Sequence, residues 1–211
     1  MTEVCASAVI AFNDHSKIGS VGVPLFKNNI RIFDNDKNCE CKYGETGEVL
    51  ISSPSLMVGY SNNEKETDAA IMTDKKGLTW IHTGDLGYID NDGFLFLLGR
   101  MKRIMFVGPE GLAYKVFPKQ IEDVLITCPF VYEVCVVSGY TGSGFAPKAY
   151  IVLKNDVNRS KEDITYELTQ LCLQEFPDYL RPYDYEYLDS MPHTAVGKID
   201  YRALEKEAEK L

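Results

Sequence analysis

The segment from His82 to Phe94 and the Gly99-Arg100 pair after it combine groups that bind sugars or phosphates. The segment reads His-Thr-Gly-Asp-Leu-Gly-Tyr-Ile-Asp-Asn-Asp-Gly-Phe, with Asp85 directly after a glycine. A carboxylate such as Asp85 can accept hydrogen bonds from two vicinal hydroxyls, and the guanidinium of Arg100 can bind sugar or phosphate oxygens through several donors. Each piece alone is common in structural hairpins, so the interpretation rests on their order and spacing.

A second block, from Met191 to Leu204, contains a lysine that directly follows a glycine. Gly197 lets the backbone turn tightly, and Lys198 carries a long ammonium side chain that can stabilise negative charge as it redistributes in a reaction. The block is not a P-loop, because neither Ser nor Thr follows the lysine and no glycine-rich turn precedes it. The alternative is an ordinary solvated lysine in front of a helix.

Together these blocks resemble the adenylate-forming superfamily of acyl-CoA synthetases, peptide-synthetase adenylation domains and luciferases. Those proteins share the Thr-Gly-Asp, the acidic turn, the Gly-Arg at a domain junction and a closing Pro-x-Thr-x-x-Gly-Lys-Ile-Asp-x-Arg-x-Leu. The resemblance implies that Asp85 and Arg100 contact the ribose of AMP and that Lys198 is the adenylation lysine, which bridges the substrate carboxylate and the α-phosphate. Three residues depart from the family's usual ones without moving the lysine out of register: Ala195, Val196 and Tyr201.

The same resemblance assigns roles to residues outside the two blocks. Family members carry an aromatic-Gly-x-Thr-Glu motif whose threonine touches phosphate and whose glutamate holds magnesium, and Thr2 and Glu3 match its end. Lys102 matches the residue about which the small domain swivels between two catalytic states. The loop over residues 106–118 matches the one that lines the pantetheine tunnel of CoA, although a surface loop with a hairpin turn is an equal alternative.

The activity implied is that of an ATP-dependent acid:thiol ligase, which forms acyl-AMP from a carboxylate and ATP and then a thioester with CoA. Its ligands would be ATP or AMP, Mg²⁺, CoA and a small-molecule carboxylate. Its missing partner would be the upstream part of the large domain, which supplies the phosphate loop, so the fragment alone is expected to be inactive. Two alternatives stay open: an adenylation domain that loads a carrier-protein phosphopantetheine, and a truncated binding module without catalysis.

The elements that must position these residues change character near Gly99. The first part reads as strands, over residues 29–33, 47–52 and a hairpin of 86–90 with 94–98, and one helix is expected over 63–72. We therefore expect residues 1–99 to form the β-rich, distorted-barrel end of a large domain.

Residues 100–211 are expected to form a small α+β domain with a central sheet flanked by helices. Apolar residues at i, i+3, i+4 and i+7 predict a helix that begins at Pro118. A second helix starts after Ser160 and stops before Pro177, and a third covers 201–211. Strands are expected over 131–137, 148–153 and 185–188.

Composition excludes several classes of function. The net charge of -9 argues against a nucleic-acid partner. The six cysteines form no Cys-x-x-Cys pair and the three histidines do not complete a zinc site, so we expect reduced thiols in a cytoplasmic protein. No apolar run approaches the roughly 20 residues of a transmembrane segment.

Overall fold

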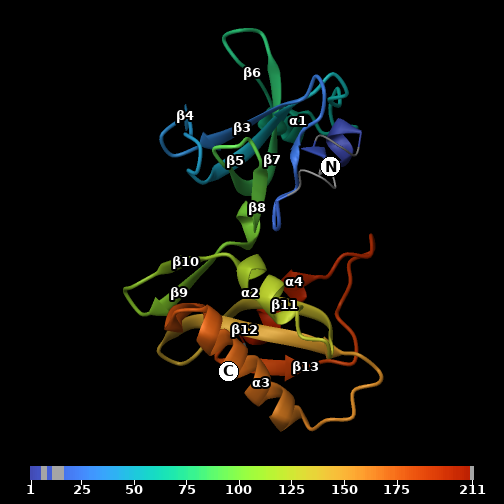
Figure 1. The fold of residues 1–211 in the computed structure, drawn as a ribbon. Helices are drawn as coiled ribbons and strands as arrows, with labels where there is room; N and C mark the ends of the chain where they lie inside the picture. The colour runs from blue at the N-terminus through green and yellow to red at the C-terminus, as the bar shows by residue number, and fades with distance from the viewer. Residues whose placement is uncertain (6–8, 11–16, 210–211) are drawn as a thin grey trace. The chain divides into compact units, whose positions relative to one another are not determined.

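The computed structural model describes residues 1–5, 9–10 and 17–209 and divides into two compact units, Met1–Lys102 and Arg103–Leu211 (Figure 1). No helix among these residues is long and apolar enough to cross a membrane. All six cysteines are free thiols.

The described strands of the first unit form a six-stranded antiparallel sheet and a separate two-stranded one. In the larger sheet the order is β4-β3-β5-β7-β6, and β6 and β8 pair with opposite ends of the long strand β7. Its strands are β4 (Cys39–Glu40), β3 (Asn29–Asp34), β5 (Gly47–Ser52), β7 (Thr79–Ile89), β6 (Ile71–Thr73) and β8 (Leu95–Arg100). The smaller pair is β1 (Val9–Ile10) and β2 (Val23–Pro24).

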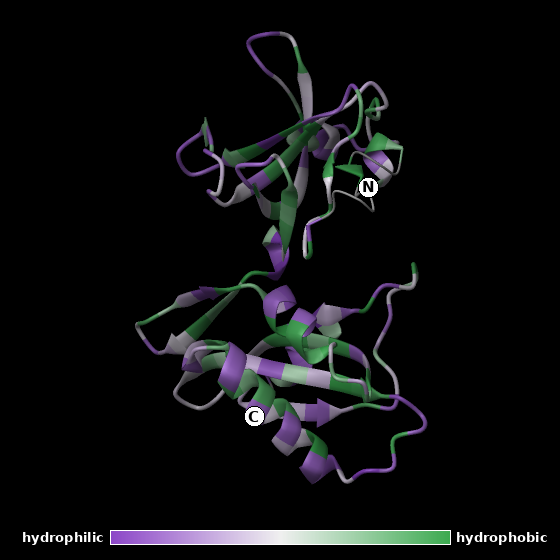
Figure 2. Cartoon of the chain, in the orientation of Figure 1, coloured by the Kyte–Doolittle hydropathy of each residue, from purple (hydrophilic) through white to green (hydrophobic). Residues whose placement is uncertain are grey.

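Strand β5 is the buried centre of this sheet, with every residue shielded from solvent. Its Val49 and Ile51 side chains belong to a core cluster with Ile32, Ile81 and Leu95 from the neighbouring strands. The hydrophilic tip of the β6–β7 hairpin, by contrast, lies far from this core (Figure 2). The buried strand β5, which is paired with β3 on one side and β7 on the other, therefore gives β7 a rigid support.

The helix expected over 63–72 is shorter in the structure. α1 spans Glu64–Ala70, and the Asn63 side chain caps it by accepting from the Glu66 backbone N–H at 3.3 Å. Ile71 and Met72 instead begin β6, where they pair with Ile81 and Trp80. The expectation was wrong for these two residues, because strand pairing outweighs a weak local helical pattern.

The second unit contains a five-stranded sheet with order β10-β9-β12-β11, and β13 runs parallel to β12. Its strands are β10 (Tyr114–Val116), β9 (Met105–Pro109), β12 (Gly144–Leu153), β11 (Val131–Tyr140) and β13 (Asp184–Tyr187). Its α-helices are α2 (Pro118–Leu125), α3 (Lys161–Glu175) and α4 (Tyr201–Ala208) (Figure 1).

Both faces of the β11–β12 pair are apolar, because each is covered by helices. Val136 and Ile151 point into a core shared with α2 and α3, whereas Cys135, Val137 and Tyr150 point into a second core shared with α4. This period-two alternation explains why the strands read as continuous apolar runs. The predicted α+β class, with a central sheet flanked by helices, is confirmed.

Three short 3₁₀ helices complete the described elements: η1 (Thr2–Val4), η2 (Met101–Arg103) and η3 (Asp178–Leu180). The Ser160 hydroxyl caps α3 by accepting from the Asp163 N–H at 3.1 Å, as predicted. The final helix was expected to reach 211, and its last two residues lie outside the described part of the chain.

Candidate functional site

Strand β7 leaves the regular ladder at the Thr-Gly-Asp sequence. Glu48 of β5 pairs with Leu86 of β7, but Leu50, two residues later, pairs with His82. Residues 83–85 therefore form a bulge opposite Val49 alone. Such bulges re-aim side chains next to functional sites.

The Thr83 side chain replaces some of the hydrogen bonds that the bulge disrupts. Its buried hydroxyl donates to the Val49 carbonyl at 2.7 Å and accepts from the Asp85 N–H at 3.0 Å. Gly84 has a φ of +67°, a left-handed conformation that favours glycine. The bulge is thereby held from inside, next to the half-buried Asp85.

A buried carboxylate lies beneath the bulge. Glu48, only 5% exposed, accepts from the Gly84 N–H at 3.0 Å through Oε1. Its Oε2 accepts from Asn35 Nδ2 at 2.8 Å and lies 2.9 Å from His82 Nδ1. Burial raises the pKa of Glu48, but the hydrogen bonds from His82, Asn35 and Gly84 outweigh it and bring that pKa below its ordinary value. The hydrogen bond to Glu48 in turn raises the pKa of His82.

The structure brings together the two predicted ribose ligands, Asp85 and Arg100. They are register partners on β7 and β8, and Arg100 Nε lies 3.0 Å from Asp85 Oδ1. Arg100 Nη1 also donates to the Thr83 carbonyl at 2.8 Å. Burial raises the pKa of Asp85 and outweighs the opposite effect of Arg100. The Arg100 side chain is 52% exposed, so the pair is open to a ligand.

The predicted phosphate and magnesium residues lie in η1. Thr2 is exposed, and the Glu3 carboxylate accepts from the Tyr60 hydroxyl at 3.3 Å. The Met57 N–H fixes the backbone by donating to the Glu3 carbonyl at 2.8 Å. The described residues contain no cluster of three possible metal ligands, but a single carboxylate suits Mg²⁺ held largely by phosphates and water.

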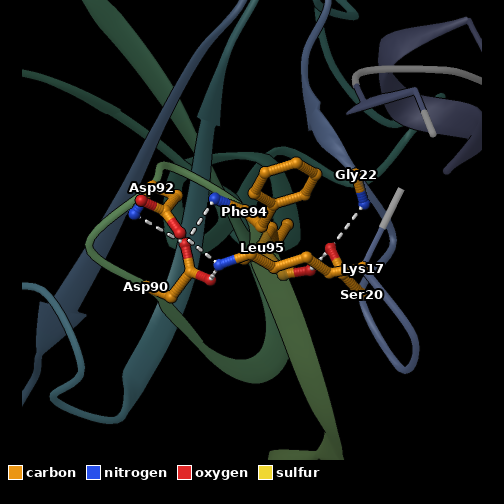
Figure 3. Close-up of polar contacts among 7 residues, drawn as sticks. All are labelled: Lys17, Ser20, Gly22, Asp90, Asp92, Phe94 and Leu95. Carbon is orange, nitrogen blue, oxygen red and sulfur yellow. Dashed lines mark hydrogen bonds and ion pairs between the residues drawn. The ribbon is translucent and has the colours of Figure 1, made fainter. Parts of the chain in front are cut away.

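The hairpin that carries Arg100 is braced by the segment that precedes β2 (Figure 3). Lys17 Nζ lies 2.5 Å from a carboxylate oxygen of both Asp90 and Asp92 in the hairpin turn. Ser20 Oγ donates to the Leu95 carbonyl at 2.9 Å. These contacts join two distant segments of the chain and support β8 from its start.

The second unit begins at a firmly held arginine, next to the predicted hinge. Lys102 is exposed in η2, whereas Arg103 forms an ion pair with Glu122 of α2, with Nη2 2.5 Å from Oε1. Arg103 Nη2 also donates to the Val136 carbonyl at 3.2 Å, and its guanidinium lies 5.2 Å from the Tyr201 ring centroid. Arg103, the first residue of the second unit, is thus held firmly by contacts within that unit.

Lys198 lies on an exposed turn of the second unit. The Thr194 N–H donates to the Lys198 carbonyl at 2.8 Å, and Gly197 has a φ of +77°. His193 and Ile199 form a bridge that closes the turn. The ammonium group has no ion-pair partner among the residues that the structure describes, which leaves it available to a ligand.

The 106–118 segment contains the antiparallel hairpin β9–β10. It borders a cavity of about 610 Å³, and the Tyr114 and Tyr179 rings in its wall stack with centroids 4.5 Å apart. A side chain at Gly144 would meet the Gly108 carbonyl oxygen at 2.2 Å, so the two strands approach closely there. The cavity therefore has glycine backbone on one side and aromatic rings on another.

Sequence analysis missed Glu48 and Arg103. For Glu48 a signal was present, because it stands in the otherwise apolar strand Gly-Glu-Val-Leu-Ile-Ser, where a buried charge requires partners. Nothing local distinguishes Arg103 from a surface residue, since its partners Glu122 and Val136 become visible only in the fold.

Comparison with known proteins identifies the class. Residues 1–61 match the model of AMP-binding enzymes, and residues 120–198 match that of the AMP-binding enzyme C-terminal domain. The chain belongs to the AMP-binding enzyme family, as its resemblance to adenylate-forming proteins predicted.

Two curated relatives are CoA ligases. The chain is 34% identical over 203 residues to 2-succinylbenzoate–CoA ligase of Bacillus licheniformis, in a match covering 94% of the chain and 39% of the relative. It is 34% identical over 190 residues to long-chain-fatty-acid–CoA ligase of Escherichia coli, covering 90% of the chain and 31% of the relative. The chain thus spans well under half the length of these relatives.

Solved structures agree. The o-succinylbenzoate CoA synthetase of Bacillus subtilis, in complex with its acyl-adenylate, matches with a TM-score of 0.81 and 33% identity over 97% of this chain and 40% of that one. An anthranilate CoA ligase in complex with anthranoyl-AMP matches with a TM-score of 0.84 and 27% identity, over 99% of this chain and 39% of that one.

Proposed function

We propose that the chain is the carboxy-terminal part of an ATP-dependent acid:thiol ligase, with the first unit contributing to nucleotide binding and the second moving between two half-reactions. The observation that carries the proposal is the bulge, which places the half-buried Asp85 beside the exposed Arg100 on adjacent strands. A carboxylate and a guanidinium so placed suit the hydroxyls and ring oxygen of a ribose.

In the first half-reaction a carboxylate oxygen attacks the α-phosphorus of ATP, and pyrophosphate leaves. Asp85 and Arg100 hold the ribose, while the Thr2 hydroxyl contacts phosphate. Glu3 would hold Mg²⁺, whose charge shields the phosphates. Lys198 supplies a mobile positive charge between the attacking carboxylate and the α-phosphate, where negative charge redistributes.

In the second half-reaction the thiol sulfur of CoA attacks the acyl carbon of acyl-AMP, the thiol proton is released, and AMP leaves. Rotation of the second unit about Lys102 would withdraw Lys198 and present the β9–β10 hairpin. The cavity beside this hairpin, with glycine backbone and stacked tyrosines in its wall, suits part of the CoA chain. The relatives named above are CoA ligases, which favours CoA over a carrier protein as the acceptor.

The six free thiols favour the cytoplasm as the location of the protein. Expression with a fluorescent tag and fractionation would test that placement directly. Recovery of the protein from a secreted or membrane fraction would contradict it.

The activity is tested in the full-length ligase that contains this chain. With a panel of carboxylates, we expect pyrophosphate release that depends on the acid, and one AMP formed for each CoA thioester. Asp85→Ala should raise the KM for ATP while leaving the KM for CoA unchanged. Release of ADP in place of AMP, or turnover that does not require a carboxylate, would contradict the proposal.

A further inference from the structure

We infer that Glu48 is a positioning residue for nucleotide binding, which fixes Asp85 through the backbone of Gly84. This inference rests on the proposed function, because it concerns how the ribose-binding carboxylate is held. Glu48 itself is buried beneath the sheet surface and is not placed to touch a ligand.

A carboxylate at this position requires an explanation. Every residue of β5 is buried, and the neighbouring side chains Val49 and Ile51 belong to the apolar core. Burying an ionised carboxylate is costly unless hydrogen bonds replace its hydration, and an apolar residue is often as stable at such a place. The role of Glu48 is therefore to be sought in what its hydrogen bonds hold.

One of the hydrogen bonds of Glu48 holds the bulge in β7. Extra residues at 83–85 face Val49 alone, so the Gly84 N–H loses a regular ladder partner and donates to Glu48 Oε1 instead. Asp85 follows directly, and its own N–H is held by the Thr83 hydroxyl. The orientation of the Asp85 carboxylate thus depends on a backbone that Glu48 keeps in place.

The second oxygen of Glu48 is fixed from two sides. Asn35 donates to Oε2 from the turn after β3, and His82 donates to it from β7. Because both donors bind Oε2, their hydrogen bonds favour the orientation of the carboxylate in which Oε1 is directed at Gly84. The three partners come from both neighbours of β5 in the sheet, so the arrangement locks the bulge across β3, β5 and β7.

The experiment measures ATP binding in the full-length ligase. We expect Glu48→Ala to raise the KM for ATP about tenfold with little change in kcat or in the KM for the carboxylate, because a ribose contact acts equally on the ground and transition states. Glu48→Gln should have a smaller effect, since its amide oxygen can still accept from Gly84. Glu64→Gln, on the exposed first turn of α1, is the matched control and should leave all three constants unchanged.

A double-mutant cycle distinguishes positioning from general damage. If Glu48 acts only through Asp85, adding Glu48→Ala to Asp85→Ala should raise the KM for ATP no further. Full additivity, or an equal rise in the carboxylate KM, would overturn the inference. If Asp85→Ala raises the KM for ATP and Glu48→Ala does not, the inference about Glu48 is wrong while the proposed function stands. If Asp85→Ala leaves the KM for ATP unchanged, the proposed ribose contact is wrong, and with it the inference about Glu48.

Thermal unfolding of each variant shows whether it folds. Should Glu48→Ala fail to fold, Asn35→Ala decides, because Asn35 is exposed and its loss removes only one hydrogen bond from Oε2. We expect a KM for ATP raised about two- to fivefold in that folded variant, the effect of losing one modest hydrogen bond. An unchanged KM in both Asn35→Ala and Glu48→Gln would contradict the inference.

Discussion

At the residue scale, Lys198 is the group whose charge matters for only part of the proposed reaction. Removing one preorganised charge-stabilising donor typically costs about 100- to 1000-fold in rate. We therefore expect Lys198→Ala in the full-length ligase to slow acyl-adenylate formation by that order, and supplied acyl-AMP to bypass the defect.

Pyrophosphate release and thioester formation, measured separately, check this prediction. Lys206→Ala, in the last turn of α4, is a matched loss of one lysine and should have no effect on either step. An equal defect of Lys198→Ala in thioester formation from acyl-AMP would show that the lysine has another role.

The His82–Glu48 pair should make stability depend on pH. The hydrogen bond to Glu48 raises the pKa of His82, so its charged form stabilises the fold below its ordinary pKa and this contribution is lost as pH rises through the raised pKa. The pKa of Glu48 is lowered, so its contribution is present above the ordinary value and lost as pH falls through the lowered one. The His82–Glu48 pair should therefore stabilise the fold most at pH values between the ordinary pKa of Glu and the ordinary pKa of His.

Melting temperatures of the 211-residue chain and of its His82→Gln variant test this dependence. The glutamine can still donate to Glu48 but carries no charge. The stability advantage of the natural chain should therefore be largest near the ordinary histidine pKa of about 6.5 or just below it, and should shrink as the pH rises through the raised pKa of His82. A constant difference across this interval would exclude a charged His82 from the pair.

The sequence pointed to Asp85, Arg100 and Lys198 through the resemblance of two motifs, the Thr-Gly-Asp to Gly-Arg segment and the closing Gly-Lys block, to those of adenylate-forming proteins. The contact between Asp85 and Arg100 follows from a hairpin, which local patterns predict well. Glu48 could not be assigned in this way, since its role depends on a bulge in another strand and on a partner across the sheet.

At the scale of elements, the proposed hinge residue Lys102 lies in η2, at the end of the first unit. Arg103 is tied to α2 and β11, and Arg100 to β7, so Lys102 lies between two anchored residues. Lys102→Pro would fix φ near -65° and should arrest one arrangement of the units, impairing one half-reaction far more than the other.

Separate adenylation and thioesterification assays of the full-length variant measure this effect. Lys102→Ala is the control, because it removes the same side chain without restricting φ, and it should retain both half-reactions. Equal losses in both steps for the proline variant would exclude Lys102 as the hinge.

Helix α3 offers a comparison of two leucines in one element. Leu168 is fully buried in the core beneath the sheet, whereas Leu173 is 43% exposed. We expect Leu168→Ala to lower the free energy of unfolding by about 2–5 kcal/mol and Leu173→Ala by less than about 1 kcal/mol. Urea unfolding of the 211-residue chain checks both, and similar losses would contradict the assigned core.

Strands β11 and β12 are longer than local sequence patterns predict. Strands were expected over 131–137 and 148–153, yet β11 and β12 continue to Tyr140 and back to Gly144. Gly139 and Pro147 weaken the local signal for a strand. Antiparallel pairing of Gly139 with Ala146 and of Ser138 with Pro147 extends both strands regardless, and no local pattern contains that information.

At the scale of the whole molecule, the chain should fold without completing the first half-reaction. Asp85, Arg100 and Lys198 can bind and stabilise charge, but they cannot by themselves align ATP with a carboxylate. We expect no acid-dependent pyrophosphate release from the 211-residue chain, measured with the carboxylate panel used for the full-length ligase. Release that Lys198→Ala abolishes would overturn this expectation.

The pairing of β9 with β12 has a consequence for how the two proposed half-reactions are ordered. Phe145 pairs with Gly108, and the Lys198 turn follows Met191, whose side chain is buried on the same sheet. The lysine and the hairpin are therefore parts of one rigid body and cannot be exchanged separately. If the proposed rotation takes place, it moves both together: presenting the hairpin to the acyl-adenylate would withdraw the lysine in the same motion, and the proposed order of the two steps would need no separate signal.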